Sequence, residues 1–206
     1  MRRTEKVFRF HELGFAAKAV AGAIVIIFTW LALPLGVLAF GGFIFLHLLL
    51  RPIERNLISA DDITAPIDGV ITDVRQEGAH WRIELLADHF QSQLIYAPTE
   101  ALVADKLWID GDYRSHEEEA SEALNARCEY QLTSPKGFDV ILSIYGARWT
   151  RLLHMPFAEG QAMVQGEPFG YGLLRSHVAI LLPNDAQIAV QKGHSCLAKQ
   201  TILATI

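Results

Sequence analysis

The sequence predicts a mainly β protein, in which an antiparallel β body follows an N-terminal membrane helical hairpin. Three observations predict this class. A run of 32 residues without a formal charge separates Lys18 from Arg51. From about residue 60 onwards, the apolar residues fall in short alternating or β-branched runs between turn residues, which is the pattern of strands. Turns centred on glycine recur in the second half of the chain. We therefore expect two domains, residues 1–51 and residues 52–206.

The uncharged run predicts attachment to a membrane. The 206-residue chain has a mean hydropathy of +0.22, and a run of about 18 or more apolar residues is typical of a membrane-embedded segment. Pro34 lies in the middle of the run, where it removes a helical hydrogen bond and clashes with the preceding turn. We therefore expect two short helices, over residues 17–33 and 36–50, each about 22–25 Å long. A spanning hairpin and a shallow re-entrant hairpin both fit these lengths.

The charges predict which side of the membrane the body faces. The formal net charge is −5 for the chain and +4 for residues 1–51, which leaves −9 for residues 52–206. Positive charge flanks the uncharged run on both sides, as the positive-inside rule requires of cytoplasmic ends. We therefore expect the inner membrane of a cell, with the body on its cytoplasmic side. A cleaved signal peptide fits poorly, because the run is too long and no small-residue cleavage site closes it. The acidic body argues against nucleic acid as a partner.

The body is expected to contain a single helical segment, residues 115–126, which is rich in Glu and Ala. Its strands are expected at Gly69–Val74, Trp81–Leu86, Phe138–Ile144, His177–Leu182, Ile188–Val190 and Thr201–Ala204. The glycine turns of Met163–Glu167 and Val190–His194 are typical of the hairpins in barrel-sandwich folds, such as lipoyl and biotinyl carriers. A carrier needs an exposed lysine at a hairpin tip, flanked by Asp or Met. Neither Lys192 nor Lys199 has that setting, so the sequence argues against a carrier.

The sequence predicts no metal site and no disulfide framework. Cys128 and Cys196 are too few and too far apart for either, and they are expected to be thiols in a reducing compartment. His116 precedes three glutamates, Glu117–Glu119. Consecutive carboxylates on a helix point in different directions, so this cluster is interpreted as a solvated face.

Several short motifs follow one another along the chain: Arg51-Pro52-Ile53-Glu54-Arg55, Ala65-Pro66-Ile67-Asp68-Gly69, Asn125-Ala126-Arg127, Ile144–Arg151, Gly170–Ser176 and Leu182-Pro183. In this order and spacing they resemble the motifs of the short bacterial and archaeal phosphatidylserine decarboxylases. No single motif is specific, because Pro-x-Asp-Gly alone is an ordinary turn. Without the resemblance, Asp68 would be a turn residue and Ser176 a buried hydroxyl.

The resemblance implies a pyruvoyl-dependent, membrane-attached enzyme of phospholipid biosynthesis, made as a proenzyme. It implies that Ser176 attacks the carbonyl of Arg175, that the chain is cut there, and that the serine becomes the pyruvoyl group. The ketone of that group serves as the electron sink when CO₂ leaves phosphatidylserine and phosphatidylethanolamine forms. Asp68 corresponds to the carboxylate that orients the base for the serine hydroxyl. The partners implied are a phospholipid membrane and a phosphatidylserine-type lipid.

The chain departs from the family pattern at two positions. Gln93 stands where the family has the histidine of its Asp–His pair, and glutamine cannot act as a general base. Arg175 stands where the family has glycine, whose conformational freedom is thereby lost. His89 lies four residues before Gln93, about 13 Å along a strand. His177 adjoins Ser176, but neighbouring side chains of a strand point to opposite faces.

These departures leave a second interpretation open. The chain is either a slow phosphatidylserine decarboxylase or an unprocessed, non-catalytic relative that binds phospholipid or a partner protein. We expect mostly uncleaved protein in either case. Arg148 and Arg151 either bind a lipid phosphate or are surface charges around the indole of Trp149. The sequence does not decide between a monomer and a homo-oligomer.

Overall fold

The computed structural model describes residues 3–31, 33–52, 54–88, 91–118, 121–146, 153–173 and 175–206. The chain divides into two compact units, Met1–Arg51 and Pro52–Ile206. Each unit is described by itself.

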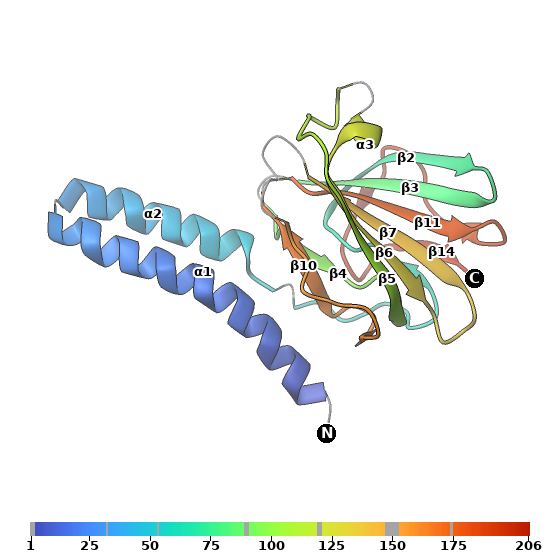
Figure 1. Cartoon of the computed structure of the whole chain (residues 1–206), viewed down its shortest axis with the longest axis horizontal. Helices are drawn as coiled ribbons and strands as arrows, with labels where there is room; N and C mark the ends of the chain where they lie inside the picture. The colour runs from blue at the N-terminus through green and yellow to red at the C-terminus, as the bar shows by residue number, and fades with distance from the viewer. Residues whose placement is uncertain are drawn as a thin grey trace. The chain divides into compact units, whose positions relative to one another are not determined.

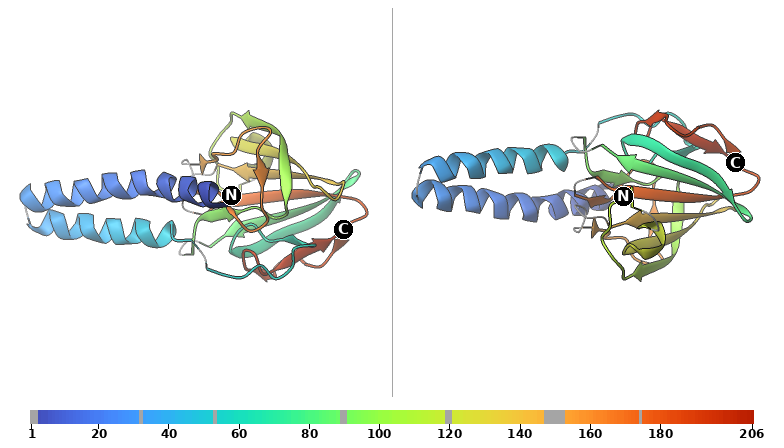
Figure 2. Two further views of the ribbon diagram at one scale, coloured as in Figure 1. Left: turned by 90° about the horizontal axis from the view of Figure 1, so that it is seen from below. Right: turned by 90° about the horizontal axis from the view of Figure 1, so that it is seen from above.

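The first unit is a pair of helices, α1 (Arg3–Leu31) and α2 (Leu33–Leu49), that lie side by side (Figures 1 and 2). Pro34 lies in the first turn of α2, where its missing N–H would have no helical partner. Gly36 permits the close approach of the two helices, because a Cβ there would lie 2.8 Å from the Cα of Thr29. The separation into two helices near Pro34 agrees with the prediction, but α1 begins at Arg3 rather than near residue 17.

The transmembrane helix that the sequence predicted is not supported, and the membrane hairpin is not confirmed. Among the described residues, none of the helices is both long enough and apolar enough to cross a membrane. Helix α2 is apolar but has only 17 residues, which gives about 25 Å against a hydrocarbon core of about 30 Å. Helix α1 has 29 residues, but charged residues recur from Arg3 to Lys18.

The second unit is built almost entirely of antiparallel strands, as predicted. Its largest sheet has eight strands in the order β13-β2-β3-β11-β7-β6-β5-β9 and curls into a half-barrel (Figures 1 and 2). The bounds of these strands, in sheet order, are Ser195–Cys196, Gly69–Glu77, His80–Ala87, His177–Pro183, Asp139–Tyr145, Arg127–Thr133, Ala101–Ile109 and Ala162–Met163.

Two three-stranded antiparallel sheets complete this unit. The first has the order β1-β14-β12, with bounds Ile63–Thr64, Ile202–Thr205 and Gln187–Ile188. The second has the order β4-β10-β8, with bounds Leu94–Tyr96, Pro168–Gly172 and Leu153–His154. The second sheet positions the candidate site, because β10 ends shortly before β11 begins.

The core lies on the concave side of the curled sheet. Alternate side chains of β3 and β11, such as Ile83, Leu85, Val178 and Ile180, are fully buried there, as the period-two pattern of the sequence requires. On the other face of the same strands, Arg82, Glu84 and His177 form a buried polar cluster. At the start of β11, Val178 therefore faces the core, and His177 faces the polar cluster.

The predicted helix over residues 115–126 is mostly wrong. Within its described part, only Ser121–Leu124 (α3) is α-helical. The amide of Asn125 accepts the N–H of Arg114 (2.7 Å) and donates to the carbonyl of Arg114 (2.9 Å). These contacts hold the segment as a closed loop, so tertiary bonding overrides the helix propensity of its Glu and Ala residues.

Candidate active site

Ser176 directly precedes β11 and is fully buried. Its hydroxyl donates a hydrogen bond to the carbonyl of Gly172 (2.7 Å), the last residue of β10. Its own carbonyl accepts the N–H of Ala87 (2.8 Å), at the end of β3. The serine is thus fixed on both sides at the junction of β10 and β11.

Arg175, the residue before this serine, has a left-handed backbone conformation with φ of +75°. Such a conformation favours glycine and costs other residues about 1–3 kcal/mol. The local backbone therefore keeps the shape that glycine would adopt, although an arginine occupies it. The guanidinium lies 3.6 Å from the Glu117 carboxylate. Solvent weakens this ion pair, because the Glu117 side chain is exposed and that of Arg175 is only half-buried.

Gln93, one residue before β4, connects directly to this junction. Its side-chain carbonyl accepts the backbone N–H of Arg175 (2.9 Å). Its amide nitrogen donates to the carbonyls of Asp88 (2.8 Å) and Gln91 (2.9 Å). The buried side chain thus makes three hydrogen bonds. It holds the N–H of Arg175, one peptide unit before the bond between Arg175 and Ser176, but it does not supply a base.

Asp68, just before β2, is buried and bound elsewhere. Arg55 donates two hydrogen bonds to its two oxygens (2.6 and 3.2 Å), and the N–H of Ala198 donates a third (2.7 Å). Gly69 pairs with Ala87, which in turn bonds Ser176. Asp68 therefore lies about two strand spacings, or about 10 Å, from the serine backbone. Among the described residues, its carboxylate has no contact with Ser176.

The structure thus brings Gln93, Arg175 and Ser176 together. Asp68 directly precedes β2, which is separated from β11 by β3. Arg148, Arg151 and His89 lie outside the described residues. In the part of the chain that the structure describes, no group of three His, Cys, Asp or Glu side chains is arranged to hold a metal ion. Cys128 and Cys196 are free and buried.

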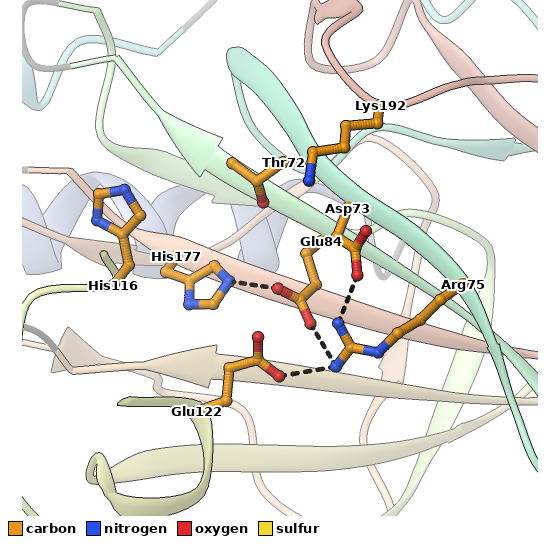
Figure 3. A pocket seen from close by; sticks show the side chains of 8 residues that line it. All are labelled: Thr72, Asp73, Arg75, Glu84, His116, Glu122, His177 and Lys192. Carbon is orange, nitrogen blue, oxygen red and sulfur yellow. Dashed lines mark hydrogen bonds and ion pairs between the residues drawn. The ribbon is translucent and has the colours of Figure 1, made fainter. Parts of the chain in front are cut away.

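A charged network on the outer face of the sheet was missed by sequence reasoning. His177 stacks on the ring of Tyr145 (4.8 Å between centroids), and its Nε2 lies 3.4 Å from the Glu84 carboxylate (Figure 3). Arg82 contacts the same carboxylate at 2.7 Å, and Arg75 contacts it at 3.0 Å. Burial alone would raise the pKa of Glu84, but the hydrogen bonds from His177 and Arg82 hold it at about 2. The sequence contained one sign of this network: in Arg82-Ile83-Glu84 the two charged residues alternate with an apolar one, which places both on the same face of a strand.

The fold and the site define a class: an antiparallel β protein with a buried serine at a strand start, preceded by a residue in a glycine-like conformation. A family model, phosphatidylserine decarboxylase, matches residues 80–204. The chain belongs to the phosphatidylserine decarboxylase family. The matched range includes Gln93, Arg175 and Ser176, whereas Asp68 precedes it.

Individual relatives agree with this family. A phosphatidylserine decarboxylase proenzyme of Salinibacter ruber is 23% identical over 184 residues, which are 84% of this chain and 81% of the relative. One of Zymomonas mobilis is 24% identical, over 93% of this chain and 83% of the relative. A putative archaetidylserine decarboxylase proenzyme of Methanosarcina barkeri is 28% identical, over 79% and 77%.

The family depends on a pyruvoyl group. The positions of the residues at the junction are compatible with forming such a group from Ser176. Ser176 would supply the atoms of the group, and the N–H of Ala87 already binds the serine carbonyl. The left-handed residue 175 precedes it. The proton acceptor is the missing part, because among the described residues the serine hydroxyl has only the Gly172 carbonyl as a partner.

Proposed function

We propose that the chain is a membrane-attached phosphatidylserine decarboxylase-like protein of phospholipid biosynthesis. Ser176 is its nucleophile and the source of its pyruvoyl group, which supplies an electron sink for decarboxylation of a phosphatidylserine-type lipid to phosphatidylethanolamine. One observation supports the proposal: the side-chain carbonyl of Gln93 accepts the N–H of Arg175, the residue before the fully buried Ser176.

The cleavage step assigns a role to each residue at the junction. The Ser176 oxygen attacks the carbonyl carbon of Arg175, an ester forms, and the C–N bond between the two residues breaks. The hydroxyl proton passes to the departing amine. Elimination across the serine Cα–H and Cβ–O bonds then releases Arg175 as a carboxylate and separates the chains. Water hydrolyses the imine tautomer of the remaining enamine to a ketone, and the serine nitrogen leaves as ammonia. Gly172 orients the hydroxyl, and Gln93 orients the peptide before the cleaved bond.

The absence of a titrating residue at position 93 makes this step slow. A missing general base typically lowers a rate by about 10²–10⁴. Cleavage occurs once per molecule, so even a slow reaction can produce active enzyme. Asp68 stays the proposed orienting carboxylate, although in the uncleaved chain its oxygens bind Arg55 and the N–H of Ala198 rather than the junction. Arg148 and Arg151 are proposed as contacts for the lipid phosphate.

Membrane attachment through the first unit is supported by its exposed apolar side chains. Trp30 is 92% exposed and Leu38 74%, and such exposure is unusual unless lipid or protein covers it. The basic residues on both sides of the uncharged run favour a body on the cytoplasmic side of the inner membrane.

The contacts of Gln93 also favour a second candidate function. Its amide is fully engaged, and Arg175 places a long side chain next to the bond to be cut. A chain that never cleaves would act as a non-catalytic family member that binds phospholipid or a partner protein.

The intact mass of the purified full-length protein distinguishes the two functions. Cleavage before Ser176 gives fragments of 175 and 31 residues, with a pyruvoyl-blocked smaller fragment. Decarboxylation of phosphatidylserine in proportion to the cleaved fraction, and none in Ser176→Ala, supports the enzyme. Whole chains that remain inactive after prolonged incubation support the non-catalytic function.

A further inference from the structure

The side chain of His177, the residue directly after Ser176, has no part in the function proposed above. It is 5% exposed and lies in the polar cluster, whereas the next side chain, Val178, lies in the core. Because neighbouring side chains of a strand point to opposite faces, the imidazole is directed away from the serine hydroxyl. Any effect of His177 on the serine therefore passes through the backbone that joins the two residues.

Two neighbouring strands hold the His177 side chain. Its ring stacks on that of Tyr145, at the end of β7, with centroids 4.8 Å apart and planes 25° from parallel. Its Nε2 lies 3.4 Å from the carboxylate of Glu84 on β3 (Figure 3). Strands β3 and β7 lie on either side of β11 in the sheet. The side chain thus joins three strands at the point where β11 begins.

The carboxylate that receives His177 is itself held in place. Glu84 is 4% exposed. The guanidinium of Arg82 contacts it at 2.7 Å, and that of Arg75 contacts it at 3.0 Å. A buried polar network whose members are all paired is rigid. The imidazole is therefore bound to a rigid part of the sheet.

Cleavage before residue 176 would remove the contacts that hold this residue from its N-terminal side. The peptide bond to Arg175 breaks, and elimination leaves the hydroxyl oxygen on the Arg175 carboxylate. The hydrogen bond from that hydroxyl to Gly172 is then lost as well. The bond from the N–H of Ala87 to the carbonyl of residue 176 (2.8 Å) is not affected by either change. The new chain end is thus held by this backbone bond and by the residue that follows it.

We propose that His177 is a positioning residue, which keeps the start of β11 on the sheet when cleavage makes it a chain end. It thereby keeps the carbonyl of residue 176 on the N–H of Ala87. The proposal rests on the proposed function, because it concerns the chain end that cleavage creates. Chain ends are poorly ordered unless they are tied down, and a displacement of about 1 Å can lower a reaction rate by about 10².

Hydrogen exchange of the Ala87 N–H, followed by NMR in the full-length protein in detergent, reports on this contact without any activity measurement. The parent is Ser176→Ala, which cannot cleave. Adding His177→Ala should speed exchange at Ala87 at least tenfold and leave Ile180, in the middle of β11, unchanged. His80→Ala, which removes an exposed histidine at the other end of β3, is the matched control and should change neither rate.

A conservative substitution separates positioning from a general loss of stability. His177→Gln places an amide nitrogen near the position of Nε2 and should restore slow exchange at Ala87. Unchanged exchange at Ala87 in His177→Ala overturns the proposal. Equal acceleration at Ile180 also overturns it, because the whole strand would then be loosened.

The kinetic test uses the cleaved fraction of the full-length protein that retains Ser176, with rates expressed per pyruvoyl group titrated with phenylhydrazine. His177→Ala should lower kcat at least tenfold and leave KM for phosphatidylserine unchanged, because the imidazole is directed away from the serine side of the sheet. His177→Gln should recover most of the loss. A raised KM with the parent's kcat contradicts positioning. If no form of the protein cleaves, the proposed function fails, whereas exchange at Ala87 still decides the role of His177.

Discussion

The side-chain carbonyl of Gln93 accepts the backbone N–H of Arg175 at 2.9 Å. Gln93, which the motif resemblance assigns to the family's histidine position, thus binds the N–H of the residue before Ser176, one peptide unit ahead of the bond to be cut. A glutamine amide keeps the hydrogen-bonding function of that position and loses its ability to take a proton. Under the proposed assignment, position 93 therefore binds the junction without being able to take the proton of Ser176.

Restoring the two family residues should restore cleavage. We expect the double variant Gln93→His with Arg175→Gly to split before Ser176, because an imidazole can take the hydroxyl proton and glycine clears the attacked carbonyl. The expected gain in cleavage rate is about 10²–10⁴, measured as the whole-chain fraction over time by intact mass. Adding Ser176→Ala should abolish cleavage. An uncleaved double variant would show that the assignment of these positions is wrong.

Arg175→Gly alone should stabilise the folded protein. Relief of a left-handed backbone conformation is worth about 1–3 kcal/mol, and the greater freedom of glycine in the unfolded chain offsets part of this gain. We expect a net increase of about 1 kcal/mol in the free energy of unfolding, measured by denaturant titration. Lys199, with φ of +69°, offers a second left-handed position, and Lys136→Gly, where φ is not positive, is the control. A loss of stability in Arg175→Gly would mean that the arginine side chain contributes more than the strain costs.

The sequence was most informative where one face of a strand is buried. Strands β2, β3, β7 and β11 were predicted because their apolar residues alternate or are β-branched. Strand β5 was missed, because its register against β6 shifts between Val103 and Asp105 and breaks the alternation of its apolar residues. Such a bulge depends on the partner strand and leaves no period in the sequence.

The site was predictable only in part. The positions of Gln93, Arg175 and Ser176 came from the resemblance of motifs, and the structure places them together. The pairing of Asp68 with Arg55 was not expected, since ion pairs between distant segments have no local signature. The same holds for Glu84 and His177, which meet only because β3 and β11 are neighbours in the sheet.

Removal of the first unit should change where the protein is found. We expect the full chain in the membrane fraction and a variant lacking residues 1–50 in the supernatant, because the exposed apolar residues of α1 and α2 are lost. The measurement is fractionation of lysed cells without detergent, and circular dichroism should show a folded β protein in the supernatant. Recovery of the intact chain in the supernatant would contradict membrane attachment.

Acid should destabilise the body through Glu84. The pKa of this buried carboxyl falls from 4.5 to about 2 in the folded state, because hydrogen bonds from His177 and Arg82 outweigh burial. A group whose pKa is lower in the folded state stabilises the protein above its unfolded pKa, and this contribution disappears as the pH falls through the folded value. A difference of this size corresponds to about 3 kcal/mol. We therefore expect the free energy of unfolding to fall steeply between about pH 4.5 and pH 2.

Glu84→Gln tests this assignment. The variant should be less stable than the parent at neutral pH, because Arg82 loses its buried partner. Its free energy of unfolding should then depend less on pH in the acid range, since the titrating group is gone. Glu129→Gln, which alters a more exposed ion pair with Arg127, is the matched control and should keep the steep acid limb of the parent. A Glu84→Gln protein with the same acid dependence as the parent would assign that dependence to other carboxyl groups.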